Sequence, residues 1–239
     1  MRAGEVSYWR FYEEVAAGQL AEWAPPAPAR VLDVSGRSPR FAEQLAALGH
    51  DVLHVRDGHD APRPAPTGQL TSVVADPRSF AWLCDRSVDA VLAESRALSM
   101  CLAAEVTAQD LLRILRPGGR LLLVVESLLL GLARLADQER WAELADVPSA
   151  DVVLVPAEDG SISRCFWPEE LRSLLTDVGF EVDWVRPRSV LAPAAVERAL
   201  SAHPEEALPT LVRTELALSR EREGESTGMH LVASARKPV

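Results

Sequence analysis

Apolar and polar positions follow two alternating patterns along this chain, short apolar runs and stripes at helical spacing. The stretch from residue 30 to residue 49 shows both clearly, with an apolar run from Arg30 to Val34 and a stripe from about Pro39 to Leu48. Ser38 suits the helix N-cap, and Gly49 suits the position that follows the helix. This stretch predicts a strand, a tight loop and a helix, the opening unit of an open α/β sheet.

The same patterns recur to the end of the chain and predict a sheet of several strands. The predicted strands are Arg30 to Val34, Asp51 to Val55, Leu70 to Ala75, Val88 to Ala93, Arg120 to Val125, Phe180 to Val185 and His230 to Ala235, and Asp151 to Val155 is strand-like. The predicted helices are Glu5 to Trp23, Pro39 to Leu48, Ser79 to Cys84, Ala103 to Leu115, Leu128 to Leu144, Pro168 to Val178, and Pro193 to Glu223 with interruptions at Pro204 and Pro209. Strands that alternate with helices favour a doubly wound, mostly parallel α/β sheet.

Composition and charge restrict the classes of function that this chain can have. The net charge of −10 argues against a protein that wraps the nucleic-acid backbone. The longest apolar run, Leu121 to Leu132, is interrupted by Glu126 and is too short to cross a bilayer. The first residues lack a signal-peptide pattern. We therefore expect a cytoplasmic protein with neither a nucleic-acid partner nor a membrane partner.

Rare residue types add little evidence of chemistry. The three cysteines are odd in number and far apart, so they fit no metal site and we predict none. Lys237 is the only lysine, and with the high alanine content this indicates a bacterial-like codon bias. None of the five histidines has a partner visible in the sequence, so none is assigned a catalytic role.

Three stretches carry a resemblance to a known family. Residues 112–124 read as a helix that ends in Leu-Arg-Pro-Gly-Gly directly before an apolar strand. Residues 166–182 read as a helix that opens with Pro-Glu-Glu-Leu and leads through Gly-Phe into a strand, and residues 230–238 form a last apolar strand. In these features the chain resembles the class I S-adenosylmethionine-dependent methyltransferases over nearly its whole length.

The resemblance implies a fold, a cofactor and a substrate class. It implies one methyltransferase-like domain over residues 1–239, built on a Rossmann-like sheet of seven strands with the last strand antiparallel and helices on both faces. The N-terminal helix (1–28) and the segments 127–166 and 187–226 would form caps or insertions. The cofactor would be S-adenosyl-L-methionine and the methyl acceptor a small molecule. Methyl transfer needs little general acid or base from the protein, because the sulfonium of the cofactor carries the reactivity.

The first loop of the family reads acid-x-Gly-x-Gly-x-Gly, and this chain departs from that pattern. The acid is Asp33, but the glycine positions hold Ser35, Arg37 and Pro39, and Gly36 is out of register. The resemblance makes Asp33, Ser35, Gly36 and Arg37 candidates for cofactor binding, with Arg37 or Arg40 pairing with the cofactor carboxylate. The alternative interpretation is an ordinary tight turn between a strand and a helix.

The ends of the second and third strands supply further cofactor candidates. The family has an acid for the ribose after the second strand, where this chain has Arg56 followed by Asp57. A bulge would present Asp57, whereas Arg56 itself would suit a phosphate better. Asp76, followed by Pro77, stands at the family's adenine position, although Asp-Pro is also a common start of a loop.

The end of the fourth strand and the N-terminal helix supply the remaining candidates. Glu94 and Ser95 lie where the family's loop faces the transferred methyl group, so Glu94 is the candidate general base or substrate-orienting acid. Glu94 could equally cap the next helix. Tyr8, Trp9 and Tyr12 could clamp the acceptor or simply pack the helix onto the core.

The altered first loop keeps a second class of function open. The chain could have the methyltransferase fold and no longer transfer methyl groups, as a binding or regulatory protein or as an enzyme that uses the pocket for other chemistry. A nicotinamide dehydrogenase is disfavoured because Gly-x-Gly-x-x-Gly is absent.

Overall fold

The fold was obtained as a computed structural model that describes residues 3–36, 38–56, 69–94, 96, 98–101, 103–150, 152–157 and 160–239. The strands are β1 (Arg30–Asp33), β2 (Asp51–Arg56), β3 (Leu70–Val74), β4 (Val88–Ala93), β5 (Leu115–Ser127), β6 (Val153–Pro156), β7 (Ile162–Phe166), β8 (Glu181–Arg188) and β9 (His230–Arg236). The helices are α1 (Ala3–Trp23), α2 (Arg40–Ala47), α3 (Ala104–Ile114), α4 (Leu128–Asp137), α5 (Trp141–Asp146), α6 (Pro168–Val178), α7 (Pro193–Ala202) and α8 (Pro204–Glu221), with a short 3-10 helix at Val147–Ser149.

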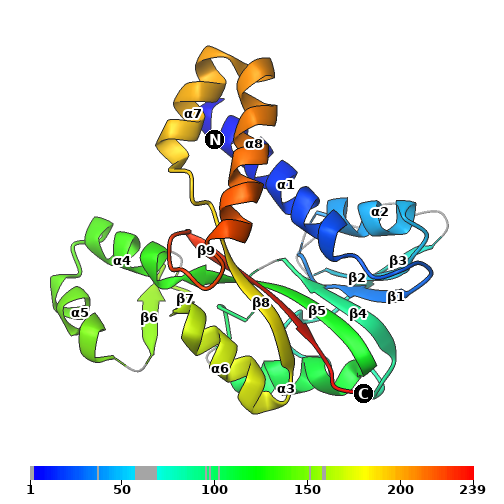
Figure 1. The fold of residues 1–239 in the computed structure, drawn as a ribbon. Coiled ribbons are helices and arrows are strands. Elements are labelled where there is room, and N and C mark those ends of the chain that lie inside the picture. Colours follow the sequence, from blue (N-terminus) through cyan, green and yellow to red (C-terminus); the bar gives the residue numbers. More distant parts are fainter. Residues whose placement is uncertain are drawn as a thin grey trace.

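These strands form one sheet in the order β3-β2-β1-β4-β5-β7-β6, with β9 also paired to β5 and β8 paired to β9 (Figure 1). Strands β1 to β5 are mutually parallel, whereas β9 runs antiparallel to both β5 and β8. The predicted doubly wound sheet with an antiparallel last strand is therefore confirmed. Because β4 and β9 flank β5, the Arg120 to Val125 run lies inside the sheet, as its apolar sequence predicts.

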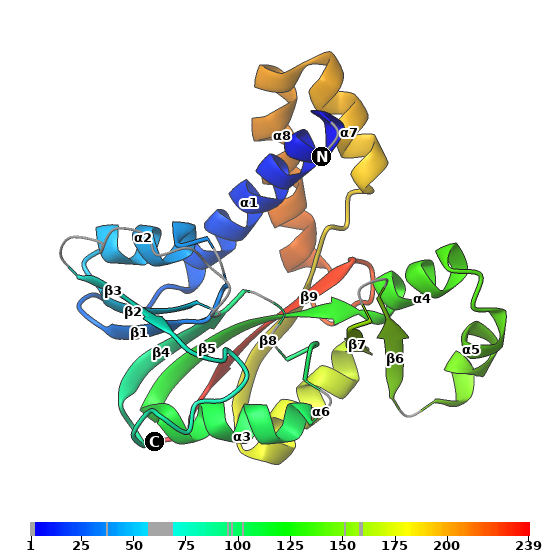
Figure 2. The same cartoon turned by 180° about the vertical axis from the view of Figure 1, so that it is seen from behind.

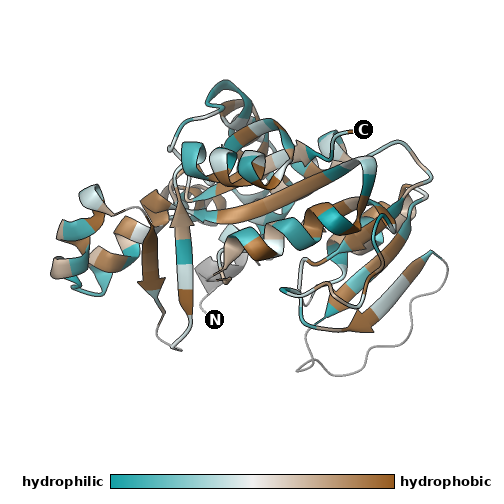
Figure 3. Ribbon diagram, turned by 90° about the horizontal axis from the view of Figure 1, so that it is seen from below, coloured by the Kyte–Doolittle hydropathy of each residue, from teal (hydrophilic) through white to brown (hydrophobic). Residues whose placement is uncertain are grey.

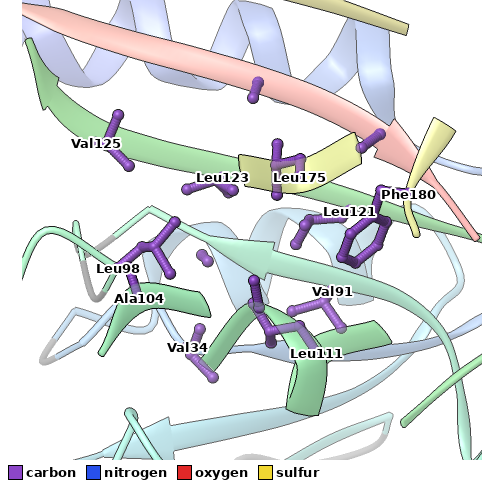
Figure 4. Packing of buried hydrophobic residues seen from close by; sticks show 14 of the residues in the cluster. Val34, Val91, Leu98, Ala104, Leu111, Leu121, Leu123, Val125, Leu175 and Phe180 are labelled. Carbon is purple, nitrogen blue, oxygen red and sulfur yellow. The ribbon is translucent and has the colours of Figure 1, made fainter. Parts of the chain in front are cut away.

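Successive residues of β5 face two different cores. Leu121, Leu123 and Val125 belong to a buried cluster that includes apolar residues of α3 and α6 (Figure 4). Leu122 and Val124 belong to a second buried cluster, which includes residues of α1 and α2. Figures 1 and 2 show α3 and α6 on one face of the sheet and α1 and α2 on the other, and Figure 3 shows hydrophobic residues along the central strands. Helices on both faces are thus confirmed.

The predicted Pro-Gly-Gly turn lies within β5 as a wide bulge. Val88 pairs with Leu115 and Ala90 pairs with Arg120, so the residues between Leu115 and Arg120 loop out against Asp89. Gly118 has φ of 75°, and a side chain at Gly119 would come within 2.8 Å of the Arg116 carbonyl oxygen. Both glycines are therefore required by the backbone.

Residues 127–166 differ from the sequence-based prediction in two ways. The predicted helix from Leu128 to Leu144 is divided into α4 and α5, because the chain turns at Glu139, which has φ of 56°. The strand-like run is β6, and it pairs with β7, a strand that the sequence pattern did not reveal. The hairpin is attached to the end of β5 through β7.

Two further predictions of helices were wrong. Residues 79–84 form turns, because the Arg113 guanidinium donates to the carbonyls of Phe80 and Leu83 and so satisfies them without a helix. Pro209 does not interrupt α8, which continues through it. The proline removes one hydrogen bond near the exposed start of the helix, where water can satisfy the freed carbonyl.

Two helical extensions project from the sheet (Figures 1 and 2). Helices α1, α7 and α8 share a core that includes Phe11, Val15, Val196 and Leu200. The segment from α4 to β7 has another core, with Leu128, Leu135, Val155 and Cys165. These extensions coincide with the predicted caps, whose role stays a prediction. No helix in the described part of the chain is long and apolar enough to cross a membrane.

Candidate functional site

The candidate site follows one edge of the sheet, where the parallel strands end. Asp33 is the last residue of β1, Arg56 is the last residue of β2, and Glu94 directly follows β4. Asp76 lies two residues beyond β3. Because these strands are adjacent and parallel, the topology brings the predicted side chains to a common edge, which is the edge where open α/β sheets bind ligands.

The first loop is a tight turn built on Asp33. One oxygen of its buried carboxylate, Oδ1, accepts the Ser35 backbone N–H at 2.8 Å. The other oxygen, Oδ2, is buried and has no hydrogen-bond partner among the described residues. Burial raises the pKa of the Asp33 carboxyl, while Ser35 and the nearby His54 act in the opposite direction. Asp33 therefore presents an unsatisfied acceptor at the end of β1.

His54 and Gly36 complete this loop. His54 is the register partner of Asp33 in the neighbouring strand, and its Nε2 lies 2.8 Å from the Gly36 carbonyl oxygen. Gly36 has φ of 86°, so the glycine that is out of register in the family pattern is the one that lets this chain turn. The structure thus assigns a fixed contact to a histidine that sequence reasoning left without a role. Arg37 lies outside the described residues.

The predicted ribose and adenine positions are more exposed. Arg56 lies at the end of β2, whereas Asp57 falls outside the described residues. Asp76 is paired with Arg78, whose Nε and Nη2 donate to the two carboxylate oxygens at 3.0 and 3.1 Å. This pairing lowers the pKa of Asp76. Pro77 continues the loop, half-buried, between the two charged residues.

Glu94 is held in a buried ion pair with Arg188, the last residue of β8. The two nitrogens Nη1 and Nη2 of Arg188 donate to Oε2 and Oε1 of Glu94, each at 2.7 Å. Arg188 is fully buried and also donates to Gln19 of α1 at 2.6 Å. Both oxygens of Glu94 are therefore occupied by one guanidinium group. Ser95, predicted beside Glu94, lies outside the described residues.

The three aromatic residues of α1 take different positions. Tyr12 accepts a hydrogen bond from Arg188 at 3.2 Å, and its ring packs edge-on against His230 at 5.4 Å. Tyr8 donates to the Ser189 hydroxyl at 2.9 Å. Trp9 is 49% exposed and packs against the edge of Tyr12. Only Tyr12 therefore contacts the charged residues at the strand ends directly.

Sequence reasoning missed three buried polar residues at this edge, Glu126, Arg188 and His230. Glu126 and Arg188 lie at or next to the ends of β5 and β8, and His230 begins β9. The available signal was a charged or polar residue at the boundary of an apolar run, as at Glu126. No group of three potential metal ligands occurs in the described ranges.

Comparisons with known proteins identify the fold. No protein-family model and no curated protein matches the chain, but many solved structures do. One is the 1,6-didemethyltoxoflavin-N1-methyltransferase of Burkholderia thailandensis, crystallised with 1,6-didemethyltoxoflavin and S-adenosylhomocysteine, with a TM-score of 0.58, 17% identity, and coverage of 97% of this chain and 81% of that one. Another is an S-adenosylmethionine-dependent methyltransferase of Mesorhizobium loti, with a TM-score of 0.58, 16% identity, and coverage of 93% and 98%.

The chain has the class I methyltransferase fold. The [4+2]-cyclase SpnF also has a similar structure, with a TM-score of 0.57, 18% identity, and coverage of 100% of this chain and 86% of that one. At such identities the likeness establishes the fold, and the activity must be argued from the site.

Proposed function

We propose that this protein is an S-adenosylmethionine-dependent methyltransferase that acts on a small molecule. The observation that supports this most directly is the unsatisfied Oδ2 of Asp33, buried at the end of β1 in a methyltransferase fold. A buried acceptor without a donor is unfavourable on its own, and the cofactor's ammonium group would supply the missing donor. The residues at the β1 end therefore fit this cofactor.

The other predicted residues would complete the cofactor site. Asp76 would accept the adenine amino group, and Arg56 would border the ribose. When bound, the cofactor supplies an electrophilic methyl group on its sulfonium, so the protein has to bind and orient the acceptor and exclude water. Burial raises the pKa of Tyr12, so its hydroxyl keeps its proton and serves as a hydrogen-bonding group.

Glu94 would orient the site rather than accept a proton. Its two oxygens are occupied by Arg188, which in turn donates to Tyr12 of α1. The pair therefore ties the end of β4 to the N-terminal helix and fixes Tyr12 beside the proposed cofactor position. We assign Glu94 to the positioning of Arg188 and Tyr12.

Titration calorimetry with S-adenosylmethionine and S-adenosylhomocysteine tests the proposal. We expect binding at about 10 μM or weaker, since side chains occupy the family's glycine positions. Asp33→Asn keeps an acceptor for Ser35 but removes the charge, and it should weaken binding by about 1–3 kcal/mol. Asp177→Asn, on the exposed surface of α6, is the control. Absence of binding by the wild type would refute the proposal, whereas binding without methyl transfer to any acceptor would favour other chemistry in this pocket.

Asp76 gives a separate prediction about the adenine. Asp76→Ala should weaken cofactor binding by about 1–3 kcal/mol, because a buried adenine amino group would lose its acceptor. The same change should reduce stability by less than about 1 kcal/mol, since the ion pair with Arg78 is half exposed. Arg78→Ala removes the ion pair and keeps the carboxylate, so it should retain affinity. Equal affinity of Asp76→Ala and wild type would place the adenine elsewhere.

A further inference from the structure

Glu126 lies where three strands of the sheet meet. In β5 it is the register partner both of Cys165 in β7 and of His230 in β9. Its side chain is 2% exposed and accepts from Arg96 Nη1 at 2.6 Å and from Arg134 Nη1 at 2.5 Å. Arg96 follows β4 and Arg134 comes from α4, so one buried carboxylate joins arginines from two different segments of the chain.

The charges of the cluster formed by Glu126, Arg96 and Arg134 do not balance. Glu126 is the one carboxylate that the two arginines contact within the described ranges, and Glu94 is already neutralised by Arg188. The side chains of Arg96 and Arg134 are 39% and 33% exposed. All hydrogen bonds that they make to described residues use Nη1. Within the described ranges their remaining N–H groups have no partner, and the described side chains of the cluster carry one excess positive charge.

The surroundings of the two arginines indicate a ligand site. Arg96 has φ of 58°, a conformation that non-glycine residues adopt mainly where the surrounding structure enforces it, often at functional sites. His230 is 9% exposed, and its Nδ1 has no partner among the described residues. The Tyr12 ring lies against His230. A cationic patch is thus bordered by an aromatic ring and an unsatisfied imidazole nitrogen.

The position of this cluster suits an acceptor site. Glu126 is the next-to-last residue of β5, and β4 separates β5 from β1, where the cofactor would lie against Asp33. Two strand spacings correspond to about 10 Å, roughly the length of a substituted aromatic ring. An acceptor whose anionic end bound at the arginines would therefore extend toward the cofactor position.

We propose that the methyl acceptor is a small molecule with a carboxylate, which binds between Arg96 and Arg134. The inference rests on the proposed methyltransferase function. A carboxylate matches the single excess charge, and its two oxygens suit the planar donor edges of guanidinium groups. The aromatic border formed by Tyr12 favours a ring next to that carboxylate.

Binding of model acids tests this independently of the cofactor. Dissociation constants of benzoate, benzamide and phenyl phosphate would be measured by NMR titration, without cofactor and again with S-adenosylhomocysteine. We expect benzoate to bind at least about tenfold more tightly than benzamide, and Arg96→Gln and Arg134→Gln each to weaken benzoate by about tenfold or more. Arg140→Gln is the control, since Arg140 lies on the same projecting segment as Arg134 and pairs with the exposed Glu143. Benzoate that binds no better than benzamide, or phenyl phosphate that binds tenfold better than benzoate, would overturn the assignment.

Glu126→Gln separates ligand binding from a structural role. This variant removes the competing carboxylate and leaves both arginines in place, so benzoate affinity should rise by about threefold or more. A purely structural Glu126 would instead give an unchanged or lower affinity, which would count against the site. If the wild type binds benzoate but does not bind S-adenosylhomocysteine, the methyltransferase proposal is refuted and the anion site remains supported.

Discussion

Replacement of Arg188 by methionine is expected to lower the free energy of unfolding by about 3–5 kcal/mol, because it leaves the Glu94 carboxylate buried without its partner. Arg188 is fully buried, and it contacts Glu94, Gln19 and Tyr12 at once. Burial alone would lower the pKa of Arg188, but Glu94 and Tyr12 raise it, so the guanidinium remains charged. Urea denaturation at pH 7 measures the effect.

Two further variants show whether the loss of stability comes from the unpaired Glu94 carboxylate. In the Glu94→Gln/Arg188→Met double variant no unpaired charge remains, so much of the lost stability should return. Arg198→Met, on the exposed side of α7, should change stability by less than about 0.5 kcal/mol. A loss below about 1 kcal/mol for Arg188→Met would show that water reaches Glu94 and that the pair is not buried.

Acid should destabilise the wild type more steeply than a His230→Gln variant. Burial first, and then Arg96, Arg188 and Arg134, lower the pKa of His230 to about 3, whereas an unfolded histidine has about 6.5. Since the folded pKa is depressed, the stability is fully present above pH 6.5 and is lost as the pH falls toward 3. Between these values each pH unit removes about 1.4 kcal/mol. From pH 7 to pH 5 the wild type should therefore lose about 2 kcal/mol more than the variant.

The difference in stability between the wild type and His230→Gln isolates the contribution of the His230 imidazole. The pKa of His50 is also lowered by burial, and the pKa values of Asp33 and Glu215 are raised by burial, which acts in the opposite direction on stability. These groups are present in both proteins, so their effects cancel in the difference. Urea titrations at pH 7, 6 and 5 supply the slopes. Parallel slopes would mean that folded His230 takes up a proton readily.

Local sequence patterns were sufficient to predict seven strands of the sheet, and β6 as a strand-like run. The β5 run is apolar at both odd and even positions because each face meets a different core, and this signal is contained within a few residues. The β7 strand had no such signal. It buries Ser163 and Arg164, and Arg164 is satisfied by Glu105 and Glu170 from two different helices. Only the folded chain brings those partners together.

The same distinction applies to the candidate site. Parallel strands necessarily bring their carboxyl ends to one edge, so the positions of Asp33, Asp76 and Glu94 follow from topology. The ion pair of Glu94 with Arg188 does not follow from topology, because the two residues lie 94 positions apart in the sequence. The contact of Arg96 with Glu126 likewise depends on the fold, because the two residues are 30 positions apart in the sequence.

The way in which the β6–β7 hairpin is attached to β5 allows residues 128–165 to vary independently of the other strands. Ser127 and Phe166 are strand partners, so the chain leaves β5 and pairs with it again at neighbouring positions. The segment between them carries its own core, and loop-closure entropy changes only slowly with length. Recombination could therefore exchange residues 128–165, including Arg134, between proteins of this fold without replacing β1 and β4, which position Asp33 and Glu94. If the proposed acceptor site is correct, chimeras joined at these two residues would change the acceptor preference and keep the proposed cofactor-binding residues.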